Sequence, residues 1–207
     1  MLRDIAIPRN NEAEFLELAS KLAMKKLCFL YDFDKCNQEE IQKKIDLITN
    51  HKSITVETGF MVNQKNINKA SKQSKLLIVK SSSMDRIFIE SKKINLIYGF
   101  DEIQSKDYLY QRGSGLNHII CELAKKNNVA IGFSYSSLFN KNTRLISLLM
   151  GRMMQNISLC QKYKVKTIIG SFSENPYDLR SFYDITSLFT MFGMDSKNIK
   201  DSLVSNI

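Results

Sequence analysis

Residues 111–120 (QRGSGLNHII) place Arg112, two glycines and His118 directly before an apolar helical pattern. Backbone amides at a helix N-terminus, with a guanidinium beside them, are groups that bind phosphate. Ser114 is the expected N-cap of this helix, and His118 is expected in its first turn. The glycines do not continue into a dinucleotide-binding or P-loop pattern. The stretch therefore fits either an anion-binding turn or an ordinary helix start with a surface arginine.

A second candidate stretch, residues 173–181 (SENPYDLRS), also follows an apolar strand pattern. Pro176 is expected to set a turn and Asp178 to cap the next helix. Tyr177 and Arg180 could stack on or bind a nucleotide. Both stretches offer an arginine where a helix begins, so together they could form one basic, partly aromatic surface.

Residues suited to hydrolytic catalysis are scarce. The chain has two histidines, His51 and His118, and four cysteines, none in a Cys-x-x-Cys pair, so no zinc pattern arises. Asp4, Asp32 and Glu57 fall in or just after early strands and leave a carboxylate magnesium site open, although structural roles are favoured. We therefore expect no catalytic residue, metal or cofactor in this chain, with a metal-dependent phosphoesterase as the alternative.

The charge distribution points to a polyanionic partner. The chain of 207 residues has 30 Lys and Arg, 21 Asp and Glu, and a formal net charge of +9. Residues 58–84 and 123–173 contain no acid at all but many cations, including Arg144, Arg152 and Lys162. Lysine-rich codon bias, with lysines spread over solvated faces, would explain the cations, but it explains the missing acids less well.

The elements that must position these residues alternate along the chain. Apolar runs predict strands at residues 2–7, 26–31, 53–62, 76–80, 94–98, 129–133 and 167–172. Helical spacing predicts helices at 11–25, 38–49, 66–73, after 111–120, at 142–163 and 181–192, and near the C-terminus. This alternation indicates a mostly parallel sheet, and about seven units favour a closed or nearly closed barrel. We expect one domain over 1–207, intracellular, without a signal or membrane segment.

The order of these motifs resembles a known family. The motif SGLNH, the run MMQNISLCQKYKV from Met153, and PYDLRS before a helix ending in Phe-Gly-Met are similar to the thirty-kilodalton protein subunit family of ribonuclease P in its archaeal form (protein component 3). The resemblance is strongest over residues 112–194. The N-terminal half agrees mainly in the order of strands and helices.

The resemblance implies a TIM-barrel-like α/β fold, related to the polymerase and histidinol phosphatase superfamily but without its histidine-rich metal site. It implies a non-catalytic subunit that supports the ribonuclease P RNA, which removes the 5′ leader from precursor tRNA with Mg²⁺. Implied partners are that RNA, precursor tRNA, a small subunit of RNA-recognition-motif-like fold and other ribonuclease P proteins in the cytoplasm. A general RNA-binding scaffold is the remaining alternative.

The resemblance also carries RNA-binding roles to particular positions. The family's basic and polar residues fall on Arg112, His118, Arg152, Lys162 and Arg180. The residues themselves add two more candidates, Arg144 and Tyr177. The family is arginine-rich along the long helix, whereas Met150, Met153 and Met154 surround Arg152 here.

Overall fold

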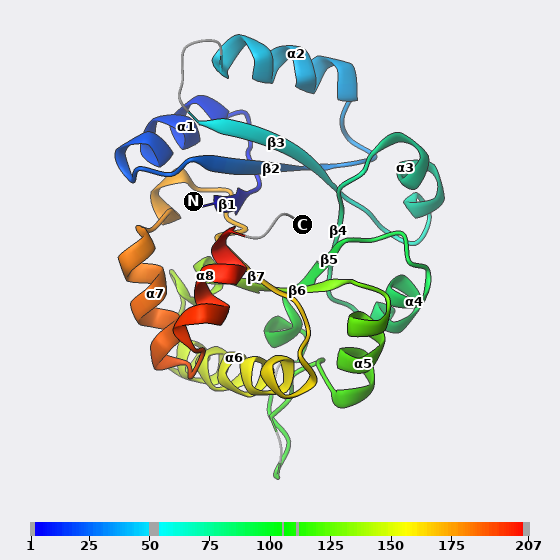
Figure 1. The fold of residues 1–207 in the computed structure, drawn as a ribbon, viewed down its shortest axis with the longest axis vertical. Coiled ribbons are helices and arrows are strands. Elements are labelled where there is room, and N and C mark those ends of the chain that lie inside the picture. Colours follow the sequence, from blue (N-terminus) through cyan, green and yellow to red (C-terminus); the bar gives the residue numbers. More distant parts are fainter. Residues whose placement is uncertain (1–2, 50–53, 105, 111, 205–207) are drawn as a thin grey trace.

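Seven strands form one parallel sheet in the order in which they occur in the chain (Figure 1). The computed structural model describes residues 3–49, 54–104, 106–110 and 112–204, so His51 and Gln111 lie outside the described residues. The strands are β1 (Arg3–Ala6), β2 (Lys26–Asp32), β3 (Thr55–Met61), β4 (Leu77–Lys80), β5 (Leu96–Tyr98), β6 (Ala130–Ser134) and β7 (Thr167–Gly170). Each overlaps a strand predicted from its apolar run.

The first strand meets the segment that follows the last strand, and this contact nearly closes the sheet into a barrel. The amide of Phe172 donates to the carbonyl of Ile5 at 2.7 Å, and the amide of Ile7 donates to that of Ser173 at 2.8 Å. Inside the barrel, the rings of Tyr98 and Phe172 stack with centroids 4.2 Å apart. The predicted TIM-barrel-like α/β fold is confirmed.

A buried carboxyl group bridges this seam. Asp4 Oδ1 accepts hydrogen bonds from the amides of Ile5 and Ser171, both at 2.6 Å, and Asp4 Oδ2 accepts from the hydroxyl of Tyr135. Burial raises the pKa of Asp4 to about 6, although these hydrogen bonds oppose the shift. The carboxyl thus joins β1, the segment after β7 and the segment after β6.

Helices surround the barrel. They are α1 (Glu12–Lys21), α2 (Gln38–Thr49), α3 (Ile67–Gln73), α4 (Asp85–Glu90), α5 (His118–Lys126), α6 (Thr143–Tyr163), α7 (Phe182–Met191) and α8 (Ser196–Val204), with short 3-10 turns η1 (Phe100–Glu102), η2 (Ser136–Leu138) and η3 (Pro176–Asp178). The sequence did not predict α4. None of the described helices is long and apolar enough to cross a membrane.

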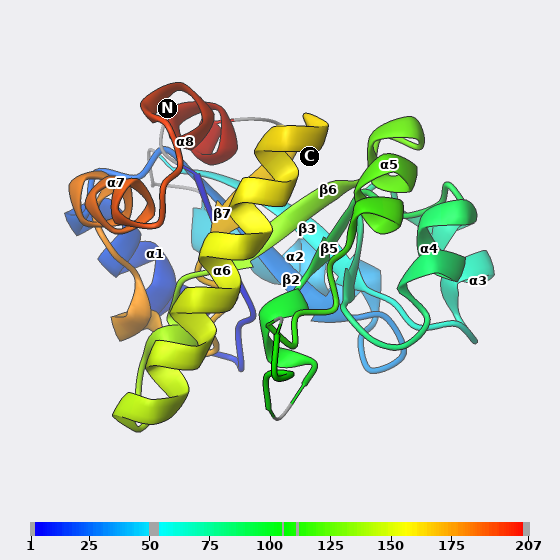
Figure 2. The ribbon, with the colours of Figure 1, turned by 90° about the horizontal axis from the view of Figure 1, so that it is seen from below.

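The two ends of the barrel differ. Helix α8 packs against the start of β7 at the amino ends of the strands, where the hydroxyls of Thr167 and Ser202 lie 2.5 Å apart. Figure 2 shows α8 at the upper end and the loops that follow β5 and β7 at the lower end, with the start of α6. We call this lower end, where the carboxyl ends of the strands lie, the carboxyl rim. In TIM barrels, functional groups gather at this rim.

Candidate nucleic-acid interface

The carboxylate of Asp107 connects the β5–α5 loop, which lies between Tyr98 and His118, to α6. Its Oδ1 accepts hydrogen bonds from the amide of Gly113 at 2.7 Å and from Nε of Arg152 at 2.8 Å. Its Oδ2 lies 3.5 Å from Nη1 of Arg112. Although desolvation works in the opposite direction, the Gly113 amide and the two guanidinium groups hold the pKa of Asp107 below its usual value. Asp107 therefore stays ionised and organises the loop.

The observed position of Arg152 differs from the predicted one. We expected it at the RNA surface, but its exposed fraction is only 1%. Besides its bond to Asp107, its Nη1 donates to the carbonyls of Asp101 at 2.9 Å and Gln104 at 2.6 Å. The guanidinium donates to two backbone carbonyl groups and to the Asp107 carboxylate inside the protein. Arg152 therefore positions the β5–α5 loop and does not present its charge to a partner.

Two glycines allow the loop and α6 to approach closely. A Cβ on Gly113 would collide with the backbone carbonyl of Lys106. A Cβ on Gly151, in the middle of α6, would collide with the guanidinium of Arg112. The side chain of Arg112 therefore lies against α6 while remaining exposed at the surface.

The start of α5 differs from the expected one. Asn117, not Ser114, caps the helix, and its side chain accepts from the amide of Ile120 at 3.0 Å. Ser114 instead donates to Oδ1 of Asn156 on α6 at 2.6 Å. Because this contact engages the Ser114 hydroxyl, the helix begins three residues later. His118 is exposed in the first turn of α5, as predicted.

The β7–α7 loop presents the second predicted arginine. Arg180 Nη1 donates to the carbonyls of Tyr177 and Leu179, both at 2.8 Å, and the guanidinium carbon lies 4.4 Å from the ring centroid of Phe139. The described hydrogen bonds of Arg180 use Nη1 alone, which leaves Nε and Nη2 for an anion. The Tyr177 side chain is 73% exposed beside it.

The cap of α7 was also wrongly predicted. Ser181, not Asp178, is the N-cap, and it forms a capping box with Asp184. Asp178 instead accepts from the hydroxyl of Ser173 within its own loop. These contacts fix the loop that carries Arg180.

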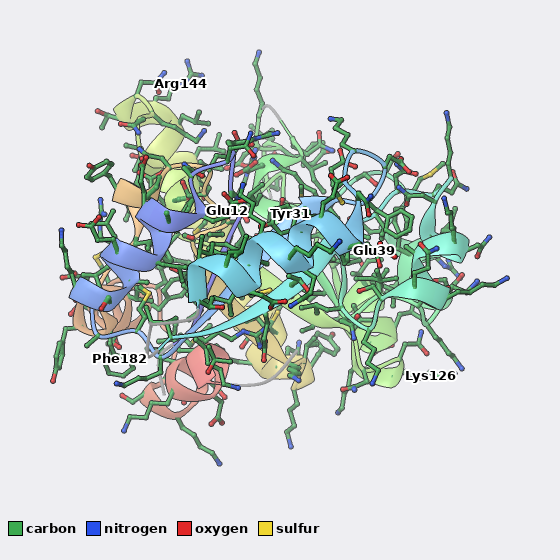
Figure 3. All side chains as sticks on the ribbon, turned by 90° about the horizontal axis from the view of Figure 1, so that it is seen from above. Glu12, Tyr31, Glu39, Lys126, Arg144 and Phe182 are labelled. Carbon is green, nitrogen blue, oxygen red and sulfur yellow. The ribbon has the colours of Figure 1, made fainter. Side chains whose placement is uncertain are left out.

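The other candidate cations lie at opposite ends of α6. Arg144 is exposed in the first turn, and Figure 3 shows it at an outer corner of the molecule, opposite Lys126. Lys162 is exposed in the last turn and lies over the ring of Tyr163. With a rise of about 1.5 Å per residue, α6 separates Arg144 and Lys162 by about 27 Å. Hence Arg112, His118, Arg144, Tyr177 and Arg180 lie on elements at the carboxyl rim, and Lys162 does not.

The early carboxylates that motivated the phosphoesterase alternative lie apart. Asp4 lies in the barrel seam, Glu57 pairs with Arg3 at 2.9 Å, and Asp32 pairs with Lys35 at 3.2 Å. Across the described ranges, no three His, Cys, Asp or Glu side chains are grouped so as to hold a metal ion. The donor set of a metallohydrolase is not assembled by these residues.

An ion pair occupies the rim above β1 and β2, where barrel enzymes often bind substrates. Lys44 Nζ lies 2.8 Å from Oε2 of Glu12, and the hydroxyl of Tyr31 donates to Oε1 of Glu12 at 3.2 Å. Burial, followed by the neighbouring Glu12 carboxylate, raises the pKa of Tyr31. Figure 3 shows Glu12 and Tyr31 close to α2. The Glu12 carboxylate at this part of the rim is therefore already bonded by Lys44 and Tyr31.

Sequence reasoning missed the residues that hold the interface together, namely Asp107, Asn117, Phe139, Gly151 and Asn156. One of these residues could have been recognised from the sequence. Glycine inside a helix destabilises it by about 1 kcal/mol relative to alanine, so Gly151 within a long apolar pattern indicates a close approach by another group. The sequence does not show that the approaching group is the guanidinium of Arg112.

Comparisons with known proteins agree with the motif resemblance. A family model described as RNase P subunit p30 matches residues 1–207. Ribonuclease P protein component 3 of Methanothermobacter thermautotrophicus is 24% identical over 71% of this chain and 61% of its own length. The protein of the same name from Thermococcus kodakarensis is 32% identical over 62% of this chain and 56% of its own. The chain thus spans somewhat over half of these relatives.

A solved structure shares the fold. One chain of a cryo-EM structure of archaeal ribonuclease P with mature tRNA superposes with a TM-score of 0.80, covering 97% of this chain and 87% of the other. The two sequences are 18% identical, so this likeness describes the architecture.

Proposed function

The chain belongs to the RNase P subunit p30 family, and we propose that it is a non-catalytic protein subunit of ribonuclease P. In this proposal it binds and stabilises the RNA that removes the 5′ leader from precursor tRNA. The observation that carries the proposal is the carboxyl rim, where Arg112 and Arg180 are held at the surface by loops fixed to α6 and to Phe139.

The proposed role is electrostatic. Cations placed against RNA phosphates release counterions and reduce repulsion between packed RNA helices. Arg112 and Arg180 can each bind a phosphate through two N–H groups, which lysine cannot reproduce. The Mg²⁺ ions of the reaction then belong to the RNA subunit, and the protein lowers the Mg²⁺ concentration at which that RNA holds its active shape.

Three carboxylates on the segments that carry Arg112 and Arg180 are bonded within the protein, which reduces their repulsion of RNA phosphates. Glu174 pairs with Arg9, Asp184 belongs to the capping box of α7, and Asp107 is bonded to Arg152. The remaining partners in the proposal are precursor tRNA, the small RNA-recognition-motif-like subunit and other ribonuclease P proteins, in the cytoplasm. Lys162, at the far end of α6, would contact a different RNA segment or another subunit.

We expect the double substitution Arg112→Ala/Arg180→Ala to weaken binding of the ribonuclease P RNA by at least about 10-fold, because each arginine makes charged hydrogen bonds to a phosphate. If the rim contacts about five phosphates, log K against log[salt] has a slope near −4 to −5 for the unaltered protein. The double variant should be shallower by about 2. Filter binding from 50 to 400 mM KCl measures both quantities.

Lys125→Ala/Lys126→Ala is the matched control, because it also removes two cations, both exposed in the last turn of α5, and Lys126 lies away from the rim. Its affinity and salt slope should match those of the unaltered protein. Circular dichroism melting checks that all variants fold. A salt-independent affinity, or equal effects of the control and the double variant, would remove the rim from the RNA interface.

A further inference from the structure

The tip of the β5–α5 loop exposes three large apolar side chains in succession. Tyr108, Leu109 and Tyr110 are 58%, 87% and 94% exposed. Figures 1 and 2 both show this loop projecting from the body of the protein. A cluster of exposed apolar residues marks an interaction site, because water contact with them is unfavourable.

The base of this tip is fixed. Asp107 directly precedes it, and the 2.7 Å hydrogen bond from the Gly113 amide to Asp107 closes the loop behind it. Arg152 holds the same carboxylate from inside the protein. The tip is therefore presented by an organised base, which reduces the ordering cost of binding.

The charge around the tip favours a polyanion. Lys106 and Arg112 flank it and are both exposed. Asp107, the acid between them, already accepts from Arg152 and Gly113. An aromatic tip with cationic neighbours is the combination that binds single-stranded RNA, where rings stack on bases and cations bind the adjoining phosphates.

We propose that Tyr108 and Tyr110 stack on unpaired bases of the RNA bound at the carboxyl rim, while Arg112 binds an adjacent phosphate. The inference rests on the proposed function and extends it from phosphate binding to base stacking. The bases must be unpaired, because the ring faces of bases in a helix are already stacked on their neighbours.

The test is the affinity of Tyr108→Ala/Tyr110→Ala for the ribonuclease P RNA. We expect binding at least about 10-fold weaker, because each lost stack removes substantial binding free energy. The salt slope should stay unchanged, because no charge is removed. Tyr108→Phe/Tyr110→Phe keeps both rings and should bind within about 2-fold of the unaltered protein. Tyr183→Ala, which removes an exposed tyrosine on α7, is the matched control and should have no effect.

Crosslinking locates the contact directly. Ribonuclease P RNA containing 4-thiouridine should crosslink to the tip of the unaltered protein at unpaired uridines. Normal RNA binding by the double alanine variant would overturn the stacking proposal and leave the proposed function intact. Normal RNA binding with lost association to other ribonuclease P proteins would assign the tip to a protein partner. Failure of the unaltered protein to bind this RNA would overturn both proposals.

Discussion

Replacing Arg152 with methionine should lower the free energy of unfolding by about 3 kcal/mol, because it removes one partner of a buried ion pair and its backbone hydrogen bonds. Methionine fills much of the space but donates nothing to Asp107 or to the carbonyls of Asp101 and Gln104. The partial exposure of Asp107 keeps the loss at the lower end of the range for buried pairs. Urea denaturation measures the change.

Arg144→Met is the matched control, because it makes the same change on the same helix at an exposed position. It should change the free energy of unfolding by less than about 0.5 kcal/mol. Equal effects of the two substitutions would contradict the structural role of Arg152.

The same variant separates positioning from direct RNA contact. With Arg152 absent, the β5–α5 loop loses its anchor and RNA binding weakens. Because the buried guanidinium does not contact a phosphate, Arg152→Met should act on the salt slope only through Arg112, and in an Arg112→Ala background it should leave the slope unchanged. A direct contact would instead make the slope shallower by about 1.

Asp4→Asn should change how stability depends on pH. The folded-state pKa of Asp4 is about 6, raised from an ordinary value of 3.8 by burial. The folded protein therefore binds the proton more tightly, so the stability contributed by this group is fully present below about pH 4 and is lost as pH rises through 6. A shift of about 2 pKa units corresponds to about 3 kcal/mol.

Asparagine keeps a carbonyl oxygen for the amides of Ile5 and Ser171 but does not ionise. The difference in unfolding free energy between the variant and the unaltered protein should therefore move in favour of the variant by about 3 kcal/mol between pH 3 and pH 7. Urea denaturation at several pH values gives this difference, in which the other carboxylates cancel. A constant difference would mean that Asp4 is ionised in the folded protein throughout.

Much of the fold follows from the sequence because most of the strands are largely buried and the long helices bury one apolar stripe. The observed bounds of α2, Gln38–Thr49, are those predicted from the helical spacing of its apolar residues. Helix α4 was missed because it has only six residues, DRIFIE, too few to show a period. The closure of β1 against β7 was expected only from the number of units.

The interface was harder to predict because its key contacts join residues far apart in the chain. Arg152 donates to Asp107, which is 45 residues away in the chain. When this partner is not known, an arginine at this position of a helix is predicted to lie at the surface. Ser114 fits an N-cap by type, but its contact with Asn156 moves the cap to Asn117. Arg112 and Arg180 could be placed because each lies in a loop after a strand, and parallel strands bring such loops to one rim.

The most direct test of the central claim is to sequence the RNA that co-purifies with the tagged protein from its own cells. As a ribonuclease P subunit, the protein should recover one dominant structured RNA together with precursor tRNAs that retain their 5′ leaders. The Arg112→Ala/Arg180→Ala variant should recover less of that RNA under the same salt conditions. Heterogeneous RNA without a dominant species, or no RNA at all, would contradict the assignment.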